Sequence, residues 1–325
     1  MKNWIKSNSM AACAVALVTG GMTIGTAQAQ EVVLKFATTN AATAHLNKQI
    51  LTPWAQGINK EGKGILRIDL LHGAVLADHN NYYTRVVNDV VQISWGLTGI
   101  IAGKFPLTGV ANLPFLADKS EISSTALWRM YESGRLAKEY DEVEVMGFTV
   151  FPQGSMHARR PIKSLDDLKG LKIRVGDKIT AAIATALGGA PIAMPPSNIY
   201  QSMSKGTIDA VLVPYTAFQP FKLAEVTTHH VDARLGASAG MVFMGRKKYD
   251  SLPPAAKALL KKHSGEAFTR RFGAFWDRVQ AEARDKLVKD PKHTVTVISA
   301  SQSAQNAKSM EATTQNWVKS TPGGE

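Results

Sequence analysis

Strand-like and helix-like segments alternate along the first part of the chain, and this order limits the fold more than any other feature. Strand-like segments at residues 31–37, 64–71 and 91–96 alternate with helix-like segments at 45–58 and 80–90. Strand–helix–strand order is typical of layered α/β domains with a largely parallel sheet. We therefore predict an α/β fold in which helices cover the faces of the strands.

The second half of the chain repeats this order. After a strand at 144–151, strand-like segments at 171–175, 190–194 and 208–213 alternate with helix-like segments at 179–187 and 197–205. The chain has 325 residues, enough for about two domains of ~150 residues each. No low-complexity linker separates the halves, so we predict two α/β lobes that close on a ligand.

Capping signals indicate where several helices begin. Asp118 and Glu121 form a capping pair for a helix expected at 118–140. Ser251, with two prolines after Leu252, suits the start of a long amphipathic stretch that is broken only at Ser264-Gly265. A strand at 294–298 and a polar helix containing Trp317 are expected to follow that stretch.

The N-terminus has the pattern of a secretory signal peptide. Lys2 and Lys6 precede a stretch of apolar and small residues, and Ala27-Gln28-Ala29 forms an A-x-A cleavage site, so residues 1–29 are expected to be removed. A transmembrane anchor is the alternative, but the apolar run is short of the ~20 residues that a bilayer requires. Cys13, the single cysteine, lies in this segment without an apolar run ahead of it, which disfavours a lipoprotein anchor. The mature chain would be soluble, outside the inner membrane, and free of disulfides.

The charge is basic but dispersed. Lysine and arginine number 38 against 26 acidic residues, which gives a formal net charge of +12. Scattered basic residues in an exported protein do not indicate a nucleic-acid partner, and we interpret the charge as a general attraction for anions. No later stretch is long and apolar enough to span a membrane, so the mature protein is not expected to do so.

Motifs for catalysis, cofactors and metals are lacking. Gly188-Gly189 follows a helix and is not a nucleotide-binding turn, and no G-x-S-x-G elbow occurs. His229-His230 raise the alternative of a metal site, but adjacent strand residues point to opposite sides. Asp166-Asp167 beside Lys169 has the pattern of a solvated helix start. We therefore expect a binding protein without cofactor or metal, and not an enzyme.

The segment Pro161-Ile-Lys-Ser-Leu-Asp-Asp-Leu-Lys-Gly-Leu-Lys-Ile-Arg-Val175 resembles the substrate-binding proteins of tripartite ATP-independent periplasmic (TRAP) transporters. Further segments match the family in the same order along the chain: 103–108 with 113–116, 187–191 with 199–209, and 221–226. The resemblance covers essentially the whole mature chain. It implies a two-lobed α/β fold with hinge crossovers, a long helix spanning both lobes, and a solute in the cleft between them. It also implies a periplasmic location and membrane permease subunits as partners.

The resemblance also suggests how the chain divides. We expect lobe I to comprise residues 30–152 and 240–279, and lobe II to comprise residues 153–239 and 280–325. The crossovers would lie near Phe151-Pro152 and at 237–240, where small residues suit a hinge.

Arg174 stands where the family places an arginine that holds the solute carboxylate. Its guanidinium can form two parallel charge-assisted hydrogen bonds to a carboxylate, whereas the alternative is an exposed arginine at a strand end. A second arginine common in relatives is absent from Gly154-Ser-Met-His157, and Arg159-Arg160 are expected to be solvated. His157 is a further candidate donor, against the alternative of a structural loop histidine. Because Arg174 is the one guanidinium expected to bind the solute, we expect the solute to have one carboxylate.

Aromatic residues are expected to form the remainder of the site. In the family an asparagine often follows Gly-Thr-Ile-Asp, and here Pro214 and Tyr215 occupy that region. Trp95, at the end of a strand, lies where α/β sheets bind ligands, although core packing is the alternative for both Trp95 and Tyr215. Phe151, near the crossover, is a weaker candidate. These residues favour a small monocarboxylate with an apolar or aromatic group.

Two other functions remain open at this point. A binding protein for a ligand without a carboxylate would not depend on Arg174. A secreted α/β hydrolase or lyase would require a nucleophile or an acid–base pair, for which the sequence offers no motif.

Overall fold

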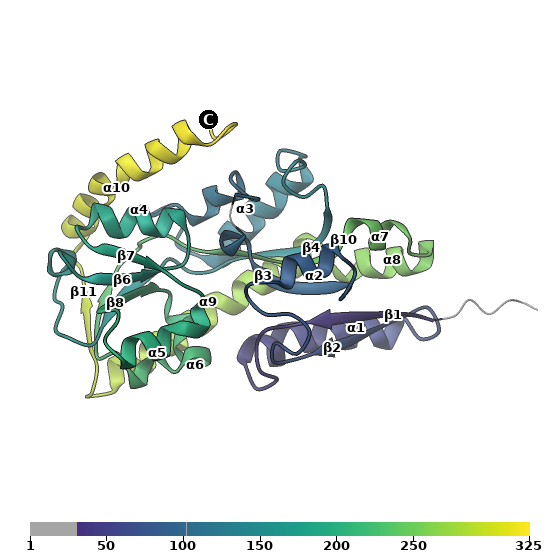
Figure 1. The fold of residues 1–325 in the computed structure, drawn as a ribbon, viewed down its shortest axis with the longest axis horizontal. Coiled ribbons are helices and arrows are strands. Elements are labelled where there is room, and N and C mark those ends of the chain that lie inside the picture. Colours follow the sequence, from purple (N-terminus) through teal and green to yellow (C-terminus); the bar gives the residue numbers. More distant parts are fainter. Residues whose placement is uncertain (1–30, 102) are drawn as a thin grey trace, which may run out of the picture.

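Two β-sheets organise the computed structural model, which describes residues 31–101 and 103–325 (Figure 1). The expected signal peptide, residues 1–29 with Cys13, lies outside the described residues. The two sheets have five and six strands, and helices pack around both. The prediction of an α/β fold with two sheets is confirmed.

The five-stranded sheet has the order β2-β1-β3-β10-β4. Its first three strands are parallel, and β10 runs antiparallel to both of its neighbours. Because β10 follows five of the six strands of the second sheet in sequence, the chain returns to the first sheet there before it adds β11 to the second. The strands are β1 (Val32–Ala37), β2 (Leu66–Leu71), β3 (Ile93–Leu97), β4 (Val143–Val150) and β10 (Ala239–Gly245), and the associated helices are α1 (Thr52–Glu61), α2 (Tyr82–Val87), α3 (Ser120–Glu132), α7 (Arg246–Asp250) and α8 (Pro254–His263).

The six-stranded sheet has the order β11-β9-β5-β8-β6-β7. Strands β8, β6 and β7 are parallel, as are β9 and β11, and β5 runs antiparallel to both of its neighbours. The strands are β5 (Ser155–Ala158), β6 (Lys172–Val175), β7 (Ala190–Ala193), β8 (Ala210–Val213), β9 (His229–Asp232) and β11 (Thr294–Val297), and the helices are α4 (Lys178–Ala186), α5 (Ile199–Ser204), α6 (Phe218–Phe221) and α10 (Ala300–Ser320).

Each sheet with its associated helices is called a body below, the first body being the one with the five-stranded sheet. One long helix, α9 (Glu266–Lys289), joins the two bodies. Gly265, at φ 86°, adopts a backbone conformation that favours glycine, and it separates α9 from α8. Phe268 and Phe272 of α9 are buried against the first sheet, whereas Leu287 near its end is buried with residues of the second. The predicted break at Ser264-Gly265 and the predicted helix spanning both lobes are confirmed.

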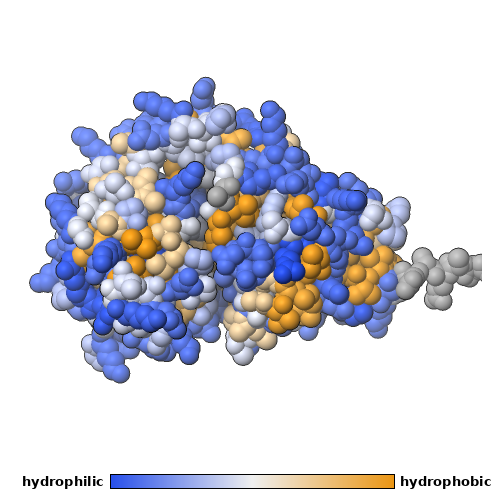
Figure 2. All heavy atoms as spheres, viewed as in Figure 1, coloured by the Kyte–Doolittle hydropathy of each residue, from blue (hydrophilic) through white to orange (hydrophobic). Residues whose placement is uncertain are grey.

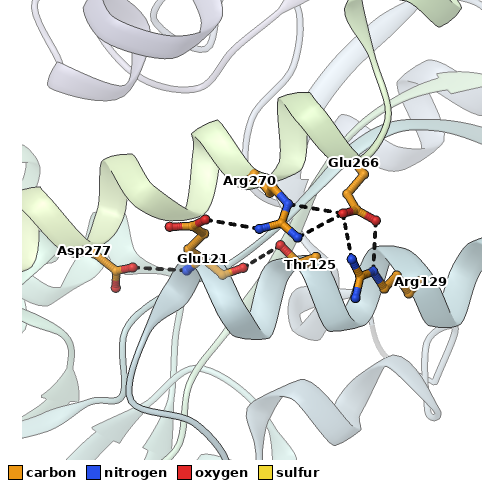
Figure 3. A network of polar contacts seen from close by, with 6 residues as sticks. All are labelled: Glu121, Thr125, Arg129, Glu266, Arg270 and Asp277. Atoms are coloured by element: carbon orange, nitrogen blue, oxygen red, sulfur yellow. Dashed lines mark hydrogen bonds and ion pairs between the residues drawn. The ribbon is translucent and has the colours of Figure 1, made fainter.

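Helix α3 packs against α9 at very short range. A Cβ atom on Gly273 would lie 2.5 Å from the Glu121 Cα, so only glycine fits there without movement. The Asp277 carboxylate of α9 accepts hydrogen bonds from the backbone N–H groups of Ser120 (2.7 Å) and Glu121 (3.1 Å). Figure 3 shows the Asp277–Glu121 contact beside two ion pairs that join the helices, Arg129–Glu266 and Arg270–Glu121, and the Arg270–Glu266 pair within α9. The cap of α3 is therefore supplied by another helix.

Two of the predicted helix starts are wrong. Helix α3 runs from Ser120 to Glu132 and not over 118–140, because Gly134 follows it with φ 79° and Asp277 provides the cap that was expected from Asp118. Ser251 does not cap the long stretch. It ends α7, where its hydroxyl donates to the Lys248 carbonyl at 2.7 Å.

Two segments cross between the sheets side by side. The Phe151 N–H donates to the Ser238 carbonyl at 2.9 Å, and Gly154 donates to Gly236 at 2.6 Å. Asn112, from the first body, holds the second segment, since its backbone and side-chain oxygens accept from the N–H groups of residues 237 and 239. The crossovers are thus hydrogen-bonded to each other and to the first body.

The outer surface is largely hydrophilic on the face shown in Figure 2, with hydrophobic patches between charged side chains. Among the helices that the structure describes, none combines the length and the hydropathy that a bilayer crossing requires.

Candidate ligand-binding site

A cavity of about 100 Å³ lies between the two sheets and is lined from both sides. The first body contributes loop residues after β1 and before α2 together with Trp95, and the second contributes Arg174 and the segment that follows β8. Phe151 and Ser238 of the crossovers and Trp276 of α9 complete the lining. The cavity continues into a more open hollow of about 640 Å³ that shares Asn40, His79 and Phe221 with it. This is the location where two lobes would enclose a solute.

Arg174, on β6, is the buried cation of this cavity, with 5% of its surface exposed. Its Nε and Nη2 donate to the Met194 carbonyl at 3.1 and 2.7 Å. These two bonds occupy one edge of the guanidinium and leave the edge formed by Nη1 and Nη2. Burial lowers the pKa of Arg174 to about 10, so it remains charged at neutral pH. The available edge matches the two oxygens of a carboxylate.

Asp177 lies beside Arg174 and also lines the cavity. Its Oδ1 caps α4 by accepting from the N–H groups of Ile179 and Thr180, both at 2.9 Å. Its Oδ2 accepts from Asn112 Nδ2 at 3.2 Å, across the interface between the two bodies. Burial raises the pKa of Asp177, while the cap hydrogen bonds and the Arg174 charge oppose that rise. The Asp177 charge acts on Arg174 and opposes the decrease in the pKa of the guanidinium.

The rings of Trp95, Phe151 and Trp276 form another part of the cavity lining, here called the aromatic wall. The Trp95 and Phe151 ring centroids are 6.1 Å apart, and those of Phe151 and Trp276 are 4.4 Å apart. The Trp276 ring in turn meets the edge of His45 at 5.7 Å. Trp95 is 4% exposed and Trp276 is 3% exposed, so the wall is closely packed. A flat apolar group suits this surface.

The structure does not place all six predicted site residues in one location. Arg174, Trp95, Phe151 and Pro214 line the cavity. Tyr215 and His157 lie instead in the core of the second body, with their ring centroids 4.9 Å apart. Residues 214 and 216 line the cavity while Tyr215, between them, is buried away from it. The side chains of this segment alternate between the two sides, which sequence alone could not orient.

His157 is a buried structural histidine in this arrangement. Its Nε2 donates to the Val213 carbonyl at 3.1 Å, and its Nδ1 lies 3.0 Å from Nδ1 of His230. Burial lowers the pKa of His157 to about 3, which keeps the ring neutral. Since Nε2 must carry the proton to bond a carbonyl, Nδ1 accepts from His230. His230 continues the chain through its Nε2, 3.0 Å from Nδ1 of His293.

Several lining residues were missed by the sequence reasoning, including Asn40, His45, His79, Asp177 and Trp276. Asn40 and His45 belong to the loop after β1, which Asn47 holds by donating to two of its carbonyls. Asp177 could have been found, since an Asp before an apolar helical pattern is an N-cap signal. Trp276 belongs to the apolar stripe of α9, and such a stripe predicts core packing equally well.

The structure gives no support for a metal centre at His229-His230. The Nδ1 atom of His229 bonds the Thr228 hydroxyl at 3.0 Å, and His230 is engaged by two other histidines. Within residues 31–101 and 103–325, no group of three or more His, Cys, Asp or Glu side chains is arranged to hold a metal ion.

Comparisons with known proteins agree with this geometry. Residues 36–321 match the family model of the bacterial extracellular solute-binding proteins, family 7. The outer membrane transporter protein TsaT of Comamonas testosteroni is 28% identical over 270 residues, which are 81% of this chain and 80% of that protein.

Two solved structures share the fold. A TRAP solute-binding protein from Rhodoferax ferrireducens, in complex with copurified benzoate, aligns with a TM-score of 0.83 at 26% identity, over 89% of this chain and 91% of that one. A TRAP periplasmic solute-binding protein from Bordetella bronchiseptica, with bound (R)- and (S)-mandelate, aligns with a TM-score of 0.82 at 26% identity, over 89% and 93% of the two chains.

Proposed function

Because the chain belongs to family 7 of the bacterial extracellular solute-binding proteins, we propose that it binds a small aromatic monocarboxylate and delivers it to the permease of a TRAP transporter. As a TRAP solute receptor, it belongs to a class that acts outside the cytoplasm and works with membrane subunits. The proposal adds the kind of solute and the residues that bind it.

The observation that carries the proposal is the composition of the cavity lining. Among the described residues that line it, Arg174 is the only lysine or arginine, and it has one guanidinium edge available. One such edge holds one carboxylate. Trp95, Phe151 and Trp276 give the rest of the solute an apolar aromatic surface. Benzoate and mandelate, named with the two similar structures, each combine one carboxylate with one ring.

The same proposal includes the division of the chain. Lobe I comprises residues 30–152 and 240–279, and lobe II comprises residues 153–239 and 280–325. The crossover segments near Phe151-Pro152 and at 237–240 act as the hinge, since the chain passes between the two sheets there and residues 237–240 are small. Residues 1–29 direct export to the periplasm and are removed.

A thermal-shift screen of the purified mature chain tests the proposal. The panel contains aromatic monocarboxylates, aliphatic monocarboxylates, dicarboxylates and sugar acids. A ligand at 100 times its dissociation constant stabilises the folded state by about 2.7 kcal/mol. We expect aromatic monocarboxylates to give the largest shifts. Larger shifts with dicarboxylates or sugar acids would contradict the proposed solute, and consumption of a compound would indicate an enzyme.

A further inference from the structure

His79 lies at the junction of the cavity and the outer hollow and lines both. Its loop, between β2 and α2, is held by reciprocal hydrogen bonds. The Asp78 N–H donates to Asn81 Oδ1 at 2.9 Å, and Asp78 Oδ1 accepts from the N–H groups of Asn80 (2.8 Å) and Asn81 (3.1 Å). The backbone on both sides of His79 is therefore fixed without any contribution from its own ring.

The His79 ring itself lacks a hydrogen-bond partner in the described part of the chain. Its Nδ1 is buried and unpaired there. A buried polar atom without a partner destabilises the protein. The Nδ1 atom of His72, in the same loop, also lacks a partner in the described part of the chain, but of the two histidines only His79 lines the cavity, where a solute can supply one. A carboxylate oxygen would supply the missing acceptor.

The charges around the cavity favour a proton at this position once an acid is bound. Arg174 and Asp177 lie together on the second body, and their charges largely compensate each other. A solute carboxylate that enters adds one negative charge to this partly buried group. An uncompensated charge in a closed cavity is costly, and a proton on a neighbouring imidazole would neutralise it.

We propose that His79 is a second solute-binding residue, which donates a hydrogen bond to the carboxylate from the lobe I side and takes up a proton as the acid enters. This inference rests on the proposed function, because it assumes that the solute is a carboxylate held by Arg174. Solute and receptor would then close with Arg174 and His79 on opposite sides of one anionic group.

The pKa of His79 is consistent with this role. Burial lowers the pKa of His79, Asp78 opposes the decrease, and the Arg174 charge adds to it. The ring is therefore neutral at pH 7 before binding. An anion placed beside it favours the protonated form, so binding raises the pKa and draws a proton from solution.

Two other groups near His79 have to be distinguished from it. His45 lines the same cavity, and burial lowers its pKa while a hydrogen bond to Gln219 raises it. Lys222, in the outer hollow, adds a positive charge near the entrance. Either His45 or Asp177 offers an alternative site for the proton, so the test includes variants of both.

Isothermal titration calorimetry with benzoate, and with mandelate as a second probe, measures the proton directly. At pH 6, the apparent binding enthalpy of the wild type is expected to differ between buffers of different ionisation enthalpy, in the direction of proton uptake. His79→Gln, which keeps a donor but does not titrate, should bind without this buffer dependence. His79→Phe should weaken binding about tenfold or more, as expected for a lost hydrogen bond to a charged group. His72→Gln is the matched control: His72 shares the loop and the buried unpaired Nδ1 but lines neither the cavity nor the hollow, so this variant should behave as wild type.

The outcomes separate the two proposals. Wild-type protein that binds neither probe nor any other aromatic acid overturns the proposed function, and this is seen before any variant is made. Binding without proton uptake in the wild type, or uptake that persists in His79→Gln, overturns the role of His79. Loss of uptake in His45→Gln or Asp177→Asn alone would also overturn it, by assigning the proton to that residue.

Discussion

Replacing Arg174 with alanine should remove most of the affinity for the solute. Arg174 is 5% exposed, and its Nε–Nη2 edge is already bonded to the Met194 carbonyl, so the Nη1–Nη2 edge is the one left for the solute carboxylate. Truncating one partner of a buried charged pair costs about 2–5 kcal/mol. This corresponds to a dissociation constant that rises about 30-fold to several thousand-fold. Calorimetry with the best acid of the panel measures the change.

Two variants show whether the loss of affinity comes from the missing pair of guanidinium donors. Arg174→Lys keeps a charge but not the planar pair of donors, so its affinity should lie between those of wild type and Arg174→Ala. Arg159→Ala is the matched control, since this exposed arginine of the same lobe donates to the Met203 carbonyl and does not line the cavity. Circular dichroism establishes that each variant is folded. A folded Arg174→Ala protein that binds within threefold of wild type would show that Arg174 does not hold the solute carboxylate.

Three further predictions concern stability and selectivity. Burial lowers the pKa of both His157 and His230. The stability that their neutral forms contribute is therefore present above about pH 6.5 and is lost as the pH falls below it. Denaturant unfolding should show a loss of about 1.4 kcal/mol per pH unit for each histidine. A flat stability between pH 6.5 and 5 would contradict this. Asp277→Ala removes the cap of α3 and should lower the free energy of unfolding by about 1–2 kcal/mol, whereas Asp277→Asn, which keeps one acceptor, should lose less. Trp95→Ala should change the ranking among acids with different rings in the thermal-shift panel, and a uniform loss for every acid would argue against a shape role.

The fold was predictable where local pattern and tertiary environment agree. The strand expected at 171–175 is β6, and the break at Ser264-Gly265 is real because the backbone there needs a conformation that glycine adopts easily. The start of α3 was not predictable, since its cap is Asp277, more than a hundred residues away in sequence. A capping pair such as Asp118 with Glu121 is a local signal, and it does not show which partner is closer in space.

The site follows the same division. Arg174 lies on a strand next to a helix start, and strand ends in α/β sheets are where ligands bind, so sequence position and a family motif both indicated it. His79 lines the cavity because its loop is held in place by hydrogen bonds, and Trp276 lines it because α9 passes between the two bodies. Neither arrangement is visible in the local sequence. Pro214 lines the cavity, whereas the next residue, Tyr215, is buried in the core. The sequence does not show which of two neighbouring side chains points toward the cavity.

The central claim is that the cavity holds a carboxylate on Arg174 and a ring against the aromatic wall. The most direct measurement is the thermal shift of the wild-type mature chain with aromatic acids paired with their amides, for example benzoate and benzamide. Each pair has the same ring and nearly the same shape, but the amide lacks the negative charge and has an NH₂ donor in place of one acceptor oxygen. We expect a clear stabilisation by at least one acid and almost none by its amide. Equal stabilisation by acid and amide, or stabilisation by amides alone, would contradict it.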